Sequence, residues 1–341
     1  MGRLLTIDEL ARETGLEESL LRFYESEHPQ ELPEKVLRGD LLLFPPQAVP
    51  AFLRIHARHT GSRTPPLHRY ARVIAVTSGK GGVGKSNLAL NLAVEMQRLG
   101  RMCLLLDADM GLANIHLLAG VDPGADIREI IAGKRPMAEL ILEGPEGIGI
   151  IPGGGGVLQL ADSNRAQRLQ IIRALEEVES RADIILVDTA AGMGPGVRDF
   201  LLAADEILFV LTPDLTSLAD AYGLLKALHQ AGPAFPPARP VYSVVNMADT
   251  VQQAAGVAVR FSDCAHRFLD REVGNIGYAL KDATVGAATM RRTPFTVFRP
   301  QARVSRNVHH LAAALLKDER PGPRAGSAFG RYLQMAAAGM R

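Results

Sequence analysis

Glycine and lysine are concentrated in one short run, Gly79–Ser86, which follows an apolar stretch and precedes a helical pattern. Glycines allow a turn in which successive backbone N–H groups face inward, and the positive end of the following helix strengthens the local field. Phosphate groups bind in such a loop, where Lys85 can reach the terminal phosphates of a nucleotide and Ser86 can ligate Mg²⁺. The predicted nucleotide-binding residues of this run are Gly79, Gly81, Gly82, Val83, Gly84, Lys85, Ser86 and Asn87.

The same glycines also fit a rival motif. From Gly79 they spell G-x-G-x-x-G, and the later acidic residues Asp107 and Asp109 lie where a dinucleotide-binding fold places its ribose carboxylate. A dinucleotide site, however, has no use for Lys-Ser at the start of the helix. It also needs no second carboxylate such as Asp188, which ends the apolar run Ile184–Val187 and suits a Mg²⁺ site. The sequence therefore favours ATP with Mg²⁺.

Short β-branched and leucine-rich runs alternate with amphipathic segments from residue 72 onward. This alternation predicts an α/β fold, a P-loop NTPase with a mostly parallel sheet covered by helices on both faces. The expected strands are Val73–Thr77, Met102–Asp107, Gly147–Ile151, Ile184–Asp188, Ile207–Thr212, Val241–Asn246 and Asn275–Tyr278. The expected helices cover about residues 85–99, 164–180, 196–203, 215–230, 250–272 and 303–317.

The domain organisation follows from shifts in composition. Residues 1–60 are predicted to form a small helical, helix-turn-helix-like domain, and residues 61–71, with Thr64-Pro65-Pro66, form a linker. The ATPase domain is expected over residues 72–318, and residues 319–341 form a basic tail.

A second lysine in the loop makes the pattern specific. The run from Lys80 to Ser86 resembles the deviant Walker A motif of the MinD/ParA family of ATPases. The resemblance implies that Lys80 reaches across an ATP-bound homodimer to the partner's phosphates. Hydrolysis of ATP to ADP and phosphate would then depend on assembly, because the extra charge arrives only when two subunits meet.

The resemblance also assigns roles to residues at later strand ends. Asp109 would orient the attacking water, and Asp107 would support the metal or the loop, although a strand-terminal Asp can also cap the next turn. The catalytic set is then Lys80, Lys85 and Asp109, and the metal set is Ser86, Asp107 and Asp188. The run Asp188–Gly192 resembles the second switch region, and Asn246 stands where the family reads adenine.

Three segments are similar to those of the FlhG group of flagellar-number regulators within this family: Asp109–Asn114, Thr212–Tyr222 and Asn246-Met247. The resemblance covers about residues 72–317. It implies an ATP-dependent switch that controls the placement or number of a surface organelle, with flagella as the expected organelle and an FlhF-like GTPase or a basal-body component as partner. No Asp-Gln-Ala triplet, which such proteins use to stimulate that GTPase, precedes the P-loop.

The N-terminal segment from Leu5 to Glu25 resembles the helix-turn-helix of MerR-type regulators, with Thr6 and Asp8 suited to an N-cap and Gly15 to the turn. Residues 1–60 hold seven Lys and Arg against ten Asp and Glu, a net charge of −3, where DNA binding favours the opposite sign. A protein-binding role is therefore favoured over DNA binding.

The C-terminal tail places Phe329, Leu333, Ala336 and Met340 on one side of a helical wheel. Relatives in the family rest such a helix on the inner membrane. Gly330 and Gly339 weaken the helix and its alanine-rich face buries little area, so a disordered tail is an equal alternative.

Composition adds limits on the class of protein. The formal charge of +1 gives no global field toward nucleic acid or lipid, and Cys103 and Cys264 lie far apart with no metal-binding spacing. We expect a cytoplasmic protein, associated at most peripherally with the inner membrane or a cell pole. The alternatives are a ParA-like DNA-binding partition ATPase and an ATP-switched transcriptional regulator.

Overall fold

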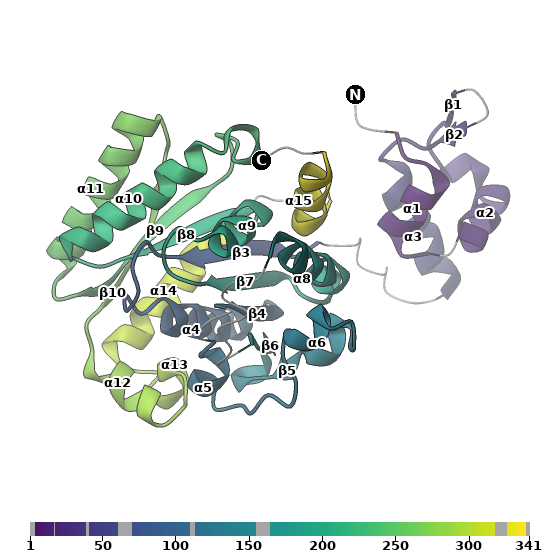
Figure 1. Cartoon of the computed structure of the whole chain (residues 1–341). Coiled ribbons are helices and arrows are strands. Elements are labelled where there is room, and N and C mark those ends of the chain that lie inside the picture. The colour runs from purple at the N-terminus through teal and green to yellow at the C-terminus, as the bar shows by residue number, and fades with distance from the viewer. Residues whose placement is uncertain are drawn as a thin grey trace. The chain divides into compact units, whose positions relative to one another are not determined.

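The computed structural model describes residues 4–16, 18–38, 41–60, 70–109, 113–154, 164–317 and 326–338. The chain forms two compact units, and the boundary between them falls after Arg69 (Figure 1). Each unit has its own hydrophobic core.

The N-terminal unit contains helices that pack on one another and a short two-stranded hairpin. Its elements are α1 (Ile7–Thr14), α2 (Glu18–Glu27), η1 (Pro29–Glu31), β1 (Val36–Arg38), β2 (Leu41–Leu43) and α3 (Ala48–Thr60). Thr6 starts α1 through a capping box, in which its hydroxyl accepts from the Glu9 N–H and its own N–H donates to the Glu9 carboxylate. Gly15 ends α1 in the left-handed conformation, at φ 68°. The turn between α1 and α2 is as predicted, whereas the antiparallel β1–β2 hairpin was missed.

An eight-stranded sheet forms the centre of the larger unit. Its strands are β3 (Arg72–Thr77), β4 (Cys103–Ala108), β5 (Leu142–Glu143), β6 (Gly149–Ile151), β7 (Ile184–Thr189), β8 (Glu206–Leu211), β9 (Val241–Ala248) and β10 (Gly274–Leu280). The strand order is β10-β9-β8-β3-β7-β4-β6-β5, and among the described strands of this sheet only β5 pairs antiparallel, with β6. The predicted mostly parallel sheet is confirmed, and the ends of β3, β7 and β4 lie side by side.

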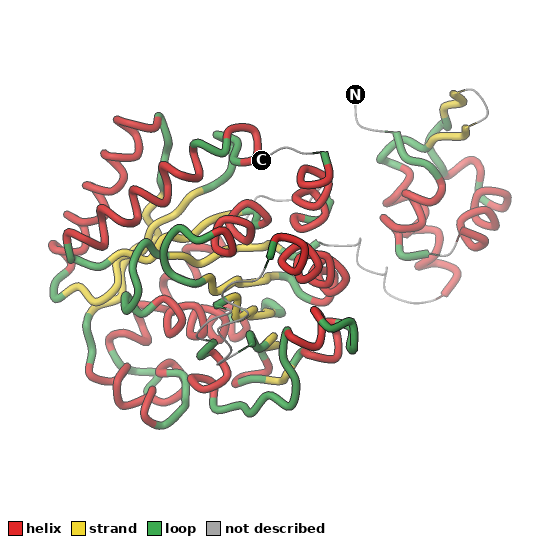
Figure 2. Tube along the Cα trace, viewed as in Figure 1, coloured by secondary structure: helices red, strands yellow, loops and turns green. Residues whose placement is uncertain are grey.

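Two helical layers cover this sheet (Figures 1 and 2). The helices are α4 (Lys85–Arg98), α5 (Ile115–Ala119), α6 (Arg128–Ile131), α8 (Arg165–Val178), α9 (Pro195–Ala203), α10 (Leu215–His229), α11 (Val251–Leu269), α12 (Ala283–Met290), α13 (Phe295–Phe298), α14 (Arg303–Lys317) and α15 (Ala328–Ala337), with the 3₁₀ turns η2 (Met137–Leu140), η3 (Pro145–Gly147), η4 (Glu179–Arg181) and η5 (Gly232–Ala234). Alternate residues of each strand face opposite layers, so Val73 packs with α8–α11 while Ile74 packs with α4 and α14.

The C-terminal helix departs from the expectation of a separate tail. α15 packs on α8 and α9, where Phe329 is fully buried and Leu333 lies against the same core. The Tyr332 hydroxyl donates to Asp199 of α9 at 2.7 Å. The buried Glu179 carboxylate accepts from the Ser327 hydroxyl and the Ala328 N–H, which anchors the start of the helix. Phe329 and Leu333 of the apolar face predicted to meet a membrane are thus used inside the protein, while Met340 lies outside the described residues.

Candidate functional site

The glycine loop joins the end of β3 to the start of α4 at the carboxyl edge of the sheet. Gly84 caps α4 in the left-handed conformation at φ 81°, and a Cβ there would lie 2.5 Å from the Asn246 amide nitrogen. A Cβ on Gly79 would lie 2.2 Å from the α10 backbone at Asp220. Both positions therefore require glycine, whereas a Cβ on Gly81 would meet no atom within 4 Å.

The floor of the loop is a buried ion pair between Lys85 and Asp188, which lies near the end of β7. The Lys85 Nζ donates to the Asp188 Oδ1 at 2.6 Å, and the Ser86 hydroxyl also bonds to this carboxylate. Burial raises the pKa of Asp188, while Lys85 and Ser86 act in the opposite direction. The three residues that sequence reasoning assigned to phosphate and metal binding are therefore brought together.

Asp107 organises the loop that follows β4. It lies directly across the sheet from Asp188. Its two oxygens accept backbone N–H groups of Asp109 at 3.2 Å, Asn114 at 2.8 Å and Ile115 at 2.9 Å. Burial and the charge of Asp188 raise the pKa of Asp107 to about 7. This geometry suits support of the loop, and metal ligation by Asp107 stays a prediction.

Lys80 lies on the rim of the loop, away from Lys85. Its Nζ donates to the Asp214 carboxylate at 2.6 Å and to the Thr216 hydroxyl at 2.8 Å, at the start of α10. This contact and two hydrogen bonds from Thr216 lower the pKa of Asp214 to about 2. The segment Thr212–Tyr222 stood out in the sequence, but its contact with Lys80 within the same subunit was not predicted.

A cavity of about 260 Å³ adjoins the loop near Asn246. The Asn246 amide donates to the Val83 carbonyl at 2.8 Å, which ties β9 to the loop. Apolar side chains and one carboxylate complete the cavity, a combination that suits a nucleotide base. The lining residues are Gly84, Asn87, Leu88, Asn246, Met247, Leu280, Lys281, Asp282, Val285, Gly286, Phe295 and Val304. Of these residues, Gly84, Asn87 and Asn246 were predicted. The lining residues between 280 and 304 were missed because they are far from the loop in the sequence.

The residues present fit a nucleotide with Mg²⁺. In the described part of the chain no three His, Cys, Asp or Glu side chains form a self-contained metal site. Mg²⁺ in nucleotide enzymes needs few protein ligands, since phosphates and water supply the others. Ser86 and Asp188 meet at the loop floor, so they would hold the ion there. The middle of the predicted first switch, residues 110–112, lies outside the described residues.

Comparison with known proteins identifies the fold. Residues 71–233 match a family model described as an AAA domain. MinD from Pyrococcus horikoshii, solved with Mg-ADP, superposes with a TM-score of 0.61 at 22% identity over 72% of this chain and 96% of that one. A chain of the MinC:MinD cell division protein complex of Aquifex aeolicus gives a TM-score of 0.60 at 26% identity over 75% of this chain and 100% of that one. The glycine loop on a parallel sheet, with Lys85 against Asp188, defines a P-loop nucleoside triphosphatase.

Two curated relatives narrow this class. The antiactivator FleN of Pseudomonas aeruginosa is 34% identical over 234 residues, 69% of this chain and 82% of FleN. The flagellum site-determining protein YlxH of Helicobacter pylori is 40% identical over 155 residues, 46% of this chain and 53% of YlxH. The chain belongs to the MinD/ParA family of P-loop ATPases, in its FlhG/FleN branch. ATP or ADP with Mg²⁺ is the cofactor set of this family. The MerR likeness of the N-terminal unit stays a prediction.

Proposed function

We propose that the chain is an ATP-dependent, dimerising switch that controls the placement or number of flagella. The buried Lys85–Asp188 pair at the base of a glycine loop supports a triphosphate site most directly. The flagellar role rests on the similarity to FleN and YlxH. No residue outside the ATPase unit is needed for this proposal.

Nucleotide binding would change the partners of Lys85 and Asp188 at the loop floor. Lys85 neutralises Asp188 in this structure, and a triphosphate would offer this lysine a stronger anion. Asp188 would then be available to a hydrated Mg²⁺, which supplies positive charge to the phosphate oxygens. Asp109, whose N–H is held by Asp107, would orient the attacking water.

Lys80 would make hydrolysis conditional on assembly. In the single subunit it is bound by Asp214 and Thr216, so its charge is directed to its own subunit. We infer that, when a second subunit faces this edge, Lys80 leaves Asp214 and Thr216 and contacts the nucleotide of that second subunit. The exposed apolar side chains at the same edge, Met193 and Leu215, are suited to burial in such an interface.

A protein partner would recognise the assembled state, either an FlhF-like GTPase or a flagellar basal-body component. We place this activity in the cytoplasm, at a cell pole or on the inner membrane surface. Within the described ranges, no helix has both the length and the apolar character needed to cross a bilayer. Membrane contact through the C-terminal segment would require α15 to leave its position on α8 and α9.

Mass measurement in solution tests the switch. With ATP, Asp109→Ala is expected to accumulate as a dimer because hydrolysis no longer resets it, whereas wild type returns to monomer as ADP forms. Asp263→Ala, which changes an exposed carboxylate on α11, is the matched control and should behave as wild type. A monomer under all nucleotide conditions would overturn the proposal. Salt-sensitive duplex binding that requires ATP would instead indicate a ParA-like DNA-binding protein.

A further inference from the structure

The segment 283–317, which carries α12 to α14, has an unusual charge distribution. It contains no Asp or Glu, although the whole chain has nearly equal numbers of acidic and basic residues, 37 and 38. Its charged residues and histidines are Arg291, Arg292, Arg299, Arg303, Arg306, His309, His310 and Lys317. Exposed helices usually mix both signs through i,i+4 pairs, so a one-signed stretch indicates an anionic partner.

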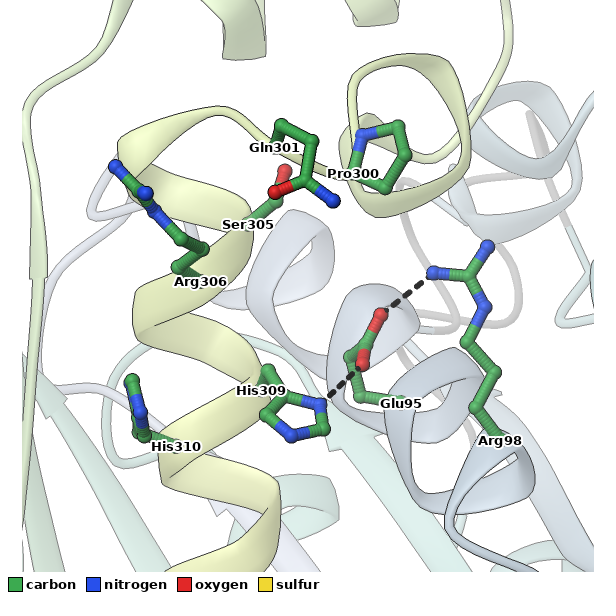
Figure 3. A pocket seen from close by; sticks show the side chains of 8 residues that line it. All are labelled: Glu95, Arg98, Pro300, Gln301, Ser305, Arg306, His309 and His310. Atoms are coloured by element: carbon green, nitrogen blue, oxygen red, sulfur yellow. Dashed lines mark hydrogen bonds and ion pairs between the residues drawn. The ribbon is translucent and has the colours of Figure 1, made fainter.

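A recess of about 350 Å³ lies between α14 and the end of α4 (Figure 3). We call it the α4–α14 recess. Its lining residues are Glu95, Arg98, Pro300, Gln301, Ser305, Arg306, His309 and His310. It is separate from the nucleotide cavity, because the two share no lining residue.

The one acid in the recess is already neutralised. Glu95 is buried, and it accepts from the Arg98 Nη1 at 2.8 Å and pairs with the His309 Nδ1 at 2.9 Å. Figure 3 shows both groups turned toward its carboxylate. Arg98 is further engaged by Glu146 at 2.9 Å. The carboxylate therefore offers little repulsion to an incoming anion.

Positive charge remains on the other flank of α14. Arg306 and His310 lie there in Figure 3, and among the described residues neither forms an ion pair. Arg303, one turn earlier, is exposed on the same face of the helix. Arg98 is shared between Glu95 and Glu146, so Arg306 is the arginine of the lining that supplies positive charge to a ligand.

The walls of the recess are held in place by hydrogen bonds. The Asn91 side chain accepts from the Thr296 N–H and hydroxyl, both at 2.9 Å, which fixes α13 to α4. The Ser305 hydroxyl bonds to the carbonyls of Phe295 at 3.1 Å and Arg299 at 2.7 Å, which fixes the start of α14. A ligand would meet a formed site, so little binding energy is lost to ordering it.

We propose that the α4–α14 recess binds an acidic segment of a protein partner, with carboxylates received by Arg306, His310 and the free edge of His309. A concave recess fits one or two side chains, whereas a nucleic acid backbone needs cations spread along a groove. The chain's overall charge of +1 also lacks the field of a nucleic-acid-binding protein. The site does not depend on the proposed ATPase cycle.

Fluorescence anisotropy on the full chain tests this. The probe is a labelled peptide of alternating Glu-Glu-Leu units, and the control peptide has Gln in place of Glu. Wild type is expected to bind the acidic peptide at least ten-fold more tightly, and the difference should shrink as salt increases. Arg306→Glu should weaken binding by about ten-fold, since a cation becomes an anion. Arg135→Glu, an equal change at an exposed site outside the recess, should leave binding unchanged.

Several outcomes would overturn the proposal. Equal affinity of the Arg306→Glu and Arg135→Glu variants would remove the recess as the binding site. Competition by inorganic phosphate at the same concentration as the peptide would indicate a simple anion site. A labelled duplex that binds while the acidic peptide does not would identify the surface as one for nucleic acid.

Discussion

The two lysines of one glycine loop form ion pairs of the same length in opposite environments. Lys85 and Asp188 meet at 2.6 Å with side chains only 8% and 1% exposed. Lys80 and Asp214 also meet at 2.6 Å, but their side chains are 43% and 46% exposed. The first pair forms the floor of the loop and the second lies on its rim.

This difference separates a contact that only a triphosphate in the loop would displace from one that water and salt can displace. A buried pair that loses one member leaves a charge without water or partner, which is costly. An exposed pair exchanges readily with water, salt or another charge, so it contributes little to stability. The floor is therefore suited to holding a fixed ligand, and the rim is suited to a lysine that changes partners.

The largest effect is expected at the floor. Lys85→Ala should lower the free energy of unfolding by about 3 kcal/mol, because Asp188 stays buried without its cation. ATP binding should be lost as well. Urea denaturation and titration calorimetry measure the two effects. Lys80→Ala in the same loop is the matched control and should leave unfolding unchanged, so equal destabilisation by both variants would contradict the comparison.

The pH dependence of stability extends this comparison to Glu179, a buried carboxylate that is not paired with a lysine in the described part of the chain. Burial raises the pKa of Glu179 to about 7, from an ordinary value of 4.5. The folded state therefore holds this proton more tightly than the unfolded one. The resulting stability is present below pH 4.5 and is lost as pH rises through about 7.

Between pH 5 and pH 8 the wild type should lose roughly 2 kcal/mol relative to Glu179→Gln, which cannot ionise. Urea midpoints at the two pH values measure this difference. An identical pH dependence of both proteins would show that Glu179 is not the group responsible.

Two glycines of the loop offer a smaller test. Gly84→Ala places a Cβ at φ 81° and 2.5 Å from the Asn246 amide, so we expect a loss of roughly 1–2 kcal/mol and weaker nucleotide binding. Gly81→Ala, where the Cβ meets no atom within 4 Å, should cost well under that. Thermal unfolding with and without ADP distinguishes them, and a reversed order would argue against the loop geometry.

The smallest effect is expected on the rim. Asp214→Asn removes the carboxylate that holds Lys80 in its own subunit, so ATP-dependent dimers should form at a concentration lower by up to about five-fold. Analytical ultracentrifugation with Asp109→Ala as the background measures the dimer fraction. Asp249→Asn, at the same edge, is the control. Weaker dimerisation in Asp214→Asn would show that Asp214 supports the interface instead.

Local signals were sufficient for most of the ATPase unit. Glycine, Lys-Ser and an apolar run ending in Asp188 each reflect a backbone or burial requirement that acts within a few residues. The seven predicted strands are present, and parallel strands place their carboxyl ends at one edge, so Ser86, Asp107 and Asp188 come together as expected. The roles of Lys80, Asp109 and Asn246 stay predictions.

Contacts between distant segments could not be deduced in the same way. The β1–β2 hairpin lies in a stretch whose apolar pattern also fits a helix, a known ambiguity of short runs. The amphipathic face of α15 indicated only that some apolar surface would cover it.

The sequence by itself determined the chemistry of the loop and the positions of the strands along the chain, because these depend on residue type and short-range periodicity. Only the tertiary structure decided which surface covers Phe329, which carboxylate holds Lys80, and that α4 and α14 enclose a recess beside Arg306. Those outcomes depend on packing between segments more than 100 residues apart in the chain, and a local pattern carries no record of such neighbours.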